Sequence, residues 1–299
     1  MEQGMRFAEI GHQLRAYRME SGLRAEEIAA RLGVSRAALY RYEKGEVIKL
    51  DTVKRMAELL KVSPMSLLGI GVEYYSRSVG FFERVRQIEE ASDQILQAFG
   101  PFCYLTSSKE YDDLLADALA HSVSIATADR SAMQVTADQV LALLTARKQA
   151  YGQRRPGIIA LLASAAIRSF LEHGIFASLP LPAELRARSR AVAAAEMNAI
   201  AELMEAEPMG LQFSLIANAE PSSGFVILRG RDRATLAVNP FRADSAPAAQ
   251  TGVAMITGAD EAVIAHQRVA EAMWRDSVRG AAAAAAVREM VASYGPGAG

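Results

Sequence analysis

Basic and aromatic side chains are interleaved with alanines in residues 35–44, which read SRAALYRYEK. On a helix, residues three and four positions apart share a face, so Arg36, Tyr40 and Lys44 fall on one side. A guanidinium donates paired hydrogen bonds to carboxylates, phosphates or the edge of guanine, and an ammonium acts as a point charge. This side therefore has the chemistry to bind an anion or a nucleic acid. A solvated charged face is the simpler alternative.

The segment is positioned by a turn between two short helices. Gly33 ends a helix predicted over 25–32, because glycine tolerates the positive φ of a tight turn. Ser35 is a good N-cap for the next helix, since its hydroxyl can accept a free backbone N–H. Five helices are predicted within residues 1–71. The first ends at Gly22, and the last two begin near Thr52 and at Pro64.

This head, residues 1–71, resembles the helix-turn-helix domain of the Cro and phage-repressor (XRE) type. The matching residues are Ile10-Gly11, Leu14, Arg18, Gly22-Leu23, Ile28-Ala29, Leu32-Gly33-Val34-Ser35, Leu39, Glu43-Lys44-Gly45 and Leu59-Leu60-Lys61-Val62-Ser63. The resemblance implies an all-α five-helix head, double-stranded DNA as partner, and an ion pair between Arg18 and Glu43. It also implies a transcription regulator, a repressor or an activator.

The DNA contacts expected of such a head follow from the shape of the major groove, which admits a helix. Arg36 or Arg41 can donate to O6 and N7 of guanine, and alanine methyl groups can contact thymine. Phosphate contacts, which fix register and affinity, are assigned to Arg24, Arg41 and Lys44. The predicted DNA-binding residues are Ser35, Arg36, Ala37, Ala38, Tyr40, Arg41, Lys44 and Arg24.

Arg24 and Ala25 depart from the family pattern, in which Ser or Thr followed by Gln often stands. The usual cap and a usual phosphate-contacting amide are therefore missing. This departure bears on how the head docks on the DNA backbone but leaves the predicted fold unchanged. Glu26 and Glu27 still suit the first turn of a helix, where the helix dipole favours acidic side chains.

The composition sets limits on the whole chain. Its 299 residues suit two domains, and a hydrophobic fraction of 51% is ample for packed cores. The net charge of −1 excludes a generic polyanion binder. The charge is uneven: residues 1–71 carry 12 Lys and Arg against 9 Asp and Glu, and the remainder carries 21 against 25. A mildly basic head permits contact with nucleic acid.

The cysteine count and the apolar runs predict a cytoplasmic protein. The one cysteine, Cys103, allows no intrachain disulfide and fits a reducing compartment. The N-terminus lacks the apolar run of a signal peptide. The longest apolar stretch in the body, residues 157–167, is too short to span a bilayer. No membrane partner is therefore expected.

The body, residues 72–299, mixes helical and strand patterns. Phe81, Val85, Ile88, Ser92, Ile95 and Phe99 make a helical stripe that predicts one helix over about 73–99. This linker, assigned to 72–100, either packs on its own body or forms a dimer seam. Further helices are predicted over 109–121, 136–151, 183–206, 259–279 and 281–293. Strands are predicted over 157–167, 211–219, 224–230, 234–241 and 251–258.

These patterns predict an α/β C-terminal domain over 101–299, with a small sheet flanked by helices. The body is also similar to the uncharacterised domain that follows XRE-type heads in many actinobacterial regulators. The similarity lies in Ile88-Glu89-Glu90-Ala91-Ser92, Leu105-Thr106-Ser107-Ser108-Lys109-Glu110-Tyr111 and Arg147-Lys148-Gln149. It implies a regulator architecture and no ligand or catalytic residues.

No catalytic site is expected. The nucleophile elbow, the P-loop and the zinc-protease motif are absent, and the four histidines have no metal-ligand spacing. Cys103 is interpreted as a buried inert thiol, with a redox sensor as the alternative. No cofactor or metal is predicted.

Three functions therefore compete. The first is a dimeric, sequence-specific transcription regulator that reads a palindromic operator and whose body responds to a small molecule or protein. The second is a protein-interaction module in which the head or body docks a regulatory partner. The third is an enzyme with a DNA-binding head.

Overall fold

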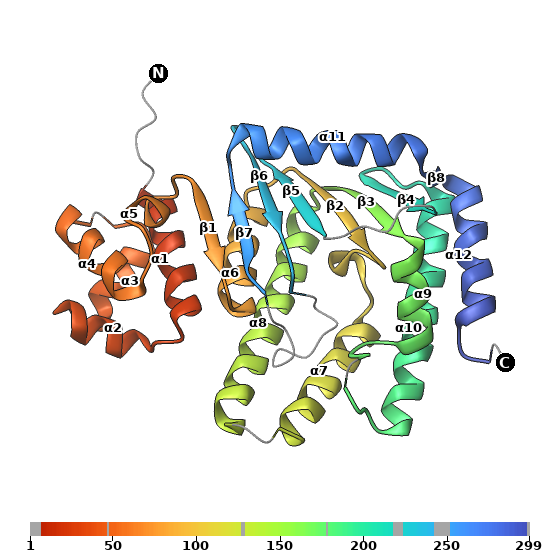
Figure 1. Cartoon of the computed structure of the whole chain (residues 1–299), viewed down its shortest axis with the longest axis horizontal. Coiled ribbons are helices and arrows are strands. Elements are labelled where there is room, and N and C mark those ends of the chain that lie inside the picture. The colour runs from red at the N-terminus through yellow and green to blue at the C-terminus, as the bar shows by residue number, and fades with distance from the viewer. Residues whose placement is uncertain are drawn as a thin grey trace.

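A computed structural model describes residues 7–46, 48–126, 129–177, 179–217, 224–241 and 252–297 of the chain. Residues 218, 219 and 251, which fall inside predicted strands, lie outside these ranges. The head contains the five predicted helices (Figure 1). They are α1 (Phe7–Ser21), α2 (Ala25–Leu32), α3 (Arg36–Glu43), α4 (Leu50–Leu60) and α5 (Pro64–Leu67). Helix α4 begins two residues before Thr52, the residue predicted to cap it.

The described part of the body is built on one mixed sheet of eight strands, in the order β1-β7-β6-β5-β2-β3-β4-β8. Strands β2, β3 and β4 are parallel neighbours, and the remaining pairs are antiparallel. The strands predicted over 224–230 and 234–241 pair as the antiparallel hairpin β5–β6. The strands are β1 (Val72–Tyr75), β2 (Gln94–Gly100), β3 (Gly157–Ala163), β4 (Leu211–Ile216), β5 (Phe225–Arg229), β6 (Ala234–Val238), β7 (Ala254–Thr257) and β8 (Val278–Arg279).

Helices cover both faces of this sheet, as an α/β architecture requires. Helix α11 lies along one face, and most of the others lie on the opposite face (Figure 1). Side chains alternate between the faces along each strand. Ile95 of β2 belongs to the larger core and its neighbour Leu96 to the smaller core under α11. The helices of the body are α6 (Ser78–Glu89), α7 (Lys109–Ser124), α8 (Arg130–Arg154), α9 (Ser164–His173), α10 (Ala183–Ala206), α11 (Asp260–Asp276) and α12 (Gly280–Tyr294), with a short 3-10 turn η1 (Tyr104–Thr106).

The single helix predicted over 73–99 is wrong. Its middle is α6, but its ends are strands β1 and β2. The apolar positions 81, 85 and 88 do have helical spacing. Residues 94–100 are a central strand with neighbours on both sides, and a strand buried on both faces does not show the polar alternation that distinguishes it from a helix.

The strand predicted over 157–167 is also too long. β3 ends at Ala163, and α9 starts at the next residue. Both halves are apolar because both are buried, so hydrophobicity alone does not mark the change from strand to helix. Helix α10 has the predicted bounds, and α7, α11 and α12 lie close to theirs.

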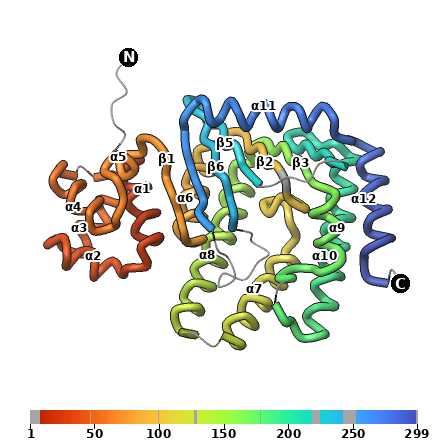
Figure 2. The backbone as a smooth tube through the Cα atoms, in the orientation of Figure 1, coloured from red at the N-terminus to blue at the C-terminus, as the bar shows by residue number. Residues whose placement is uncertain are grey.

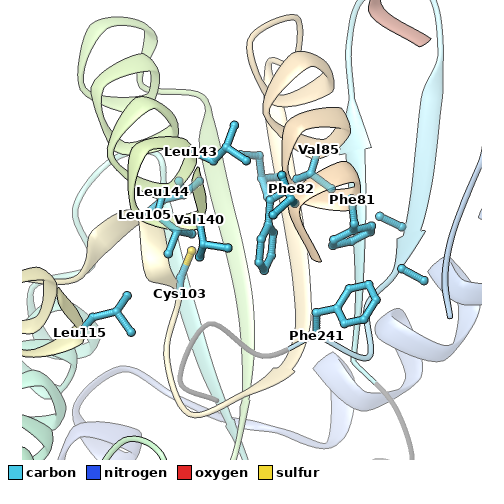
Figure 3. Packing of buried hydrophobic residues seen from close by; sticks show 14 of the residues in the cluster. Phe81, Phe82, Val85, Cys103, Leu105, Leu115, Val140, Leu143, Leu144 and Phe241 are labelled. Carbon is cyan, nitrogen blue, oxygen red and sulfur yellow. The ribbon is translucent and has the colours of Figure 1, made fainter. Parts of the chain in front are cut away.

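Head and body share one hydrophobic core. The larger cluster runs without a break from Leu14 and Met56 in the head to Phe81 and Leu144 in the body. Helix α1 packs against α6, which lies beside it in both views (Figures 1 and 2). The Tyr17 and Tyr75 rings stack at this seam, with centroids 5.3 Å apart. In the body, α6 residues Phe82 and Val85 face residues of α8 (Figure 3).

Cys103 lies inside this core and is 1% exposed. Burial raises the pKa of its thiol to about 11, so the thiol stays protonated at neutral pH. The reactive form of cysteine is the thiolate. The position therefore fits the inert thiol of the sequence interpretation.

Candidate nucleic-acid interface

A tight turn joins α2 to α3 and presents α3 at the surface. Gly33 closes α2 in the left-handed conformation, with φ of 67°. Ser35 is the N-cap of α3, and its hydroxyl accepts a hydrogen bond from the backbone N–H of Ala38 at 3.1 Å. Leu39 and Glu43 point inward and are buried. Both signals that the sequence offers, the glycine turn and the serine cap, are confirmed.

Seven of the eight predicted contact residues are at least partly exposed. They are Arg24, Ser35, Arg36, Ala37, Tyr40, Arg41 and Lys44. Ala38 is the exception, because its side chain is 9% exposed and packs inside the head. Little of its methyl group is therefore accessible for the predicted contact with thymine. Ala37 is exposed and remains a candidate for this contact.

Arg36 and Tyr40 form one unit on the outer face of α3. The guanidinium donates to the Tyr40 hydroxyl at 3.2 Å and lies over the ring, 5.3 Å from its centroid. A carboxylate oxygen of Glu26 on α2 lies 2.7 Å from the same guanidinium. The hydrogen bond with Tyr40, followed by the charge of Glu26, raises the pKa of Arg36. The cation is therefore held in place by partners that sit on the exposed surface.

Acidic side chains also accompany two of the other cations. Arg41 lies 3.5 Å from Glu46, and Arg24 lies 3.9 Å from Glu27. All four side chains are at least 41% exposed, and exposed pairs of this kind contribute little energy. An incoming phosphate can therefore replace these carboxylates at low cost. The sequence interpretation assigns Glu26 and Glu27 only to the helix dipole and misses their role as partners of the arginines.

Helix α1 fixes the inner side of α3. Arg18 grips Glu43 through two hydrogen bonds, Nε to Oε1 at 2.5 Å and Nη2 to Oε2 at 3.0 Å, as the family resemblance implies. The backbones also touch. A Cβ on Gly11 would lie 2.6 Å from the carbonyl oxygen of Glu43 and 2.7 Å from that of Tyr42. The contacts with α1 therefore fix the buried side of α3 and leave its other face exposed.

Comparison with known proteins agrees with this geometry. The sequence model of the helix-turn-helix domain family matches residues 9–67. The head is a helix-turn-helix domain. No curated protein matches the chain at a significant level. The domain supports a DNA-binding regulator, with α3 in the place of the second helix of the motif.

Neither a metal cluster nor a membrane span is found among the described residues. These residues hold no group of three or more His, Cys, Asp or Glu side chains arranged to bind a metal ion. None of the helices in the described ranges has both the length and the apolar character that crossing a membrane demands.

A buried ionic cluster at the seam between head and body is not predicted by the sequence. Glu73 of β1 lies 3.0 Å from Arg84 Nε on α6 and accepts from Gln13 Nε2 on α1 at 2.5 Å. Arg84 also lies 3.7 Å from Glu9 of α1. The Arg84 side chain is 4% exposed. The cluster joins α1 of the helix-turn-helix domain to β1 and α6 of the body.

Proposed function

We propose that this chain is a sequence-specific transcription regulator of the XRE type, most simply a repressor, that binds double-stranded DNA through α3. The observation that carries this proposal is the exposed face of Arg36, Tyr40, Arg41 and Lys44 on a helix fixed from behind by α1. Arg36 is assigned to a base edge, where a bidentate guanidinium recognises guanine. Arg41, Lys44 and Arg24 are assigned to phosphates.

We also propose that the chain forms a dimer and that its body responds to an effector. Two copies would place their α3 helices on adjacent turns of the same DNA face, about 34 Å apart, and would read a palindromic operator. The body, of the kind that follows XRE-type heads in actinobacterial regulators, would respond to an effector rather than catalyse a reaction. Such a regulator acts in the cytoplasm. An effector controls DNA binding only if it binds the DNA-competent and incompetent states unequally.

The test begins with purified full-length protein and a pool of random and genomic DNA. Enrichment of an inverted repeat, bound with a steep dependence on salt, supports the proposal. A pool with no enriched sequence, at low salt and with the protein folded, contradicts it. That result would favour the alternative in which the head docks a protein partner.

Removing the proposed phosphate-binding cations should weaken binding to all sequences. In Arg41→Ala and in Lys44→Ala, the slope of log Kd against log salt should fall by about one unit, because each variant neutralises one phosphate fewer. Fluorescence anisotropy with the enriched DNA over a salt series measures both slopes. Lys109→Ala, an exposed lysine on α7, is the matched control and should keep the wild-type slope. Unchanged slopes in both test variants would remove these residues from the interface.

Neutralising Glu26 should strengthen DNA binding. Its carboxylate holds Arg36 and repels phosphates that approach α3. Glu26→Gln should therefore lower the Kd for DNA by roughly two- to tenfold at low salt, with a smaller gain at high salt because exposed charges are screened. The same anisotropy titration measures this change. Glu110→Gln removes an exposed carboxylate from α7 and should leave the Kd unchanged. Weaker binding by Glu26→Gln would mean that Glu26 positions Arg36 rather than masking it.

A further inference from the structure

A cavity of about 270 Å³ lies where three helices of the body meet beside the head. Its walls come from the first turn of α6 and the residues just before it, the last turn of α7 and the first two turns of α8. Val79, Val123, Met133 and Ala137 give it an apolar lining. The first turn of α6 also contacts the C-terminal end of α1, because Gly80 lies against Glu20.

The cavity has one charged residue in its wall, Arg77, together with four hydroxyl-bearing residues, Ser76, Ser78, Ser122 and Thr136. No carboxylate in the described part of the chain forms an ion pair with Arg77. Its guanidinium instead lies against the head, where its Nη1 would be 2.1 Å from a Cβ placed on Gly22. An apolar cavity that is lined by one cationic residue and by no acidic residue favours a ligand with an apolar body and one anionic group.

The same wall holds the head in place. Glu20, near the C-terminal end of α1, accepts hydrogen bonds from the backbone N–H of Ser76 at 2.6 Å and of Arg77 at 3.1 Å. The Ser76 hydroxyl donates to the same carboxylate at 2.7 Å. Gly80 allows this approach, because a Cβ there would lie 3.0 Å from the Glu20 Cα. Residues 76 and 77 thus line the cavity on one side and bind α1 through Glu20.

We propose that this cavity is an effector site for a small carboxylate with an apolar tail, which binds Arg77 and acts on the contact between Glu20 and residues 76–77. The apolar tail packs between α7 and α8, and the carboxylate pairs with the Arg77 guanidinium, which turns from Gly22 of the head toward the cavity. Because that segment also holds Glu20, occupation changes the free energy of docking the head on the body. The link to DNA rests on the proposed function, whereas binding of the carboxylate does not.

Octanoate is the probe, titrated into the full chain by isothermal calorimetry. The wild-type protein should bind octanoate at least tenfold more tightly than octanamide, its uncharged counterpart. Arg77→Gln should weaken octanoate binding at least tenfold, and Ala132→Phe, which fills the exposed rim of the cavity, should abolish it. Arg186→Gln, on α10 away from this cavity, is the control and should bind as the wild type does. No binding by the wild type, or a weakening in the control equal to that in Arg77→Gln, overturns the site.

A second experiment tests whether occupation of the cavity changes the affinity for DNA. Octanoate at saturation should change the Kd of the wild type for the enriched DNA by at least threefold. In Glu20→Ala, octanoate should still bind, but this change should disappear. An equal change in both proteins would overturn the role of Glu20. DNA binding without octanoate reports on the proposed function, and calorimetry without DNA reports on the site, so the two failures are distinguishable.

Discussion

Replacing Glu73 by glutamine is expected to lower the free energy of unfolding by about 3–5 kcal/mol, because it leaves a buried cation with too few partners. Glu73 accepts hydrogen bonds from Arg84 Nε, from Gln13 Nε2 and from the Tyr75 hydroxyl, the last at 2.7 Å. Burial alone would lower the pKa of Arg84, but the charge and hydrogen bonds of Glu73 outweigh it and raise that pKa. In the variant, Arg84 keeps one carboxylate, Glu9 at 3.7 Å.

Denaturant unfolding of the full chain measures this destabilisation. Glu205→Gln is the matched control, since its ion pair with Arg288 is more than 40% exposed on both sides and should contribute less than about 1 kcal/mol. Arg84→Met together with Glu73→Gln should recover part of the stability, because the buried pair is then removed as a whole. A single Glu73→Gln variant as stable as the Glu205→Gln control would show that the cluster does not hold the seam.

The second large effect is expected at Gly11, where α1 touches the end of α3. In Gly11→Ala, the new Cβ would lie 2.6 Å from the Glu43 carbonyl oxygen and 2.8 Å from the Gly45 nitrogen. Both neighbours are backbone atoms, so a helix must shift rather than a side chain. Such overpacking costs about 1–3 kcal/mol. Because the shift moves α3, DNA affinity should fall at least tenfold.

Thermal unfolding and a DNA titration of the same preparation test the two parts of this expectation. Gly152→Ala is the control, because a Cβ at that position in α8 meets nothing within 4 Å. It should raise stability by about 0.5–1 kcal/mol, the usual gain from replacing a helical glycine. If Gly11→Ala matches Gly152→Ala in stability and DNA affinity, α1 does not fix the position of α3.

Local signals explain why the head is predictable. A glycine in the left-handed conformation and a serine cap lie close together in sequence, and each acts on the residues beside it. The same holds for hairpin β5–β6, whose turn separates two apolar runs. The pair between Arg18 and Glu43 is implied by family resemblance instead, since residues 25 positions apart carry no local sign of contact.

The structural features that the sequence does not predict are those that depend on contacts between residues distant in the chain. Residues 94–100 pair with β3 and β5, neither of which is adjacent to them in the chain, so the apolar spacing alone extends a helix over this strand. Ala38 follows three exposed residues, 35–37, which favours the outer face, yet it is buried beside Leu39. The seam joins Gln13 to Glu73, 60 residues apart, and no pattern in either segment indicates it.

Methylation interference on the enriched DNA is the most direct test of the central claim, that α3 reads the major groove. Guanine N7 lies in that groove, and its methylation blocks an arginine contact. We expect methylation of guanine N7 in each half-site to weaken binding of the wild type. At one or more of these guanines, methylation should no longer weaken binding by Arg36→Ala. The control Lys109→Ala should show the same interference at every guanine as the wild type. Interference confined to adenine N3, in the minor groove, with none at guanine N7, would contradict the account.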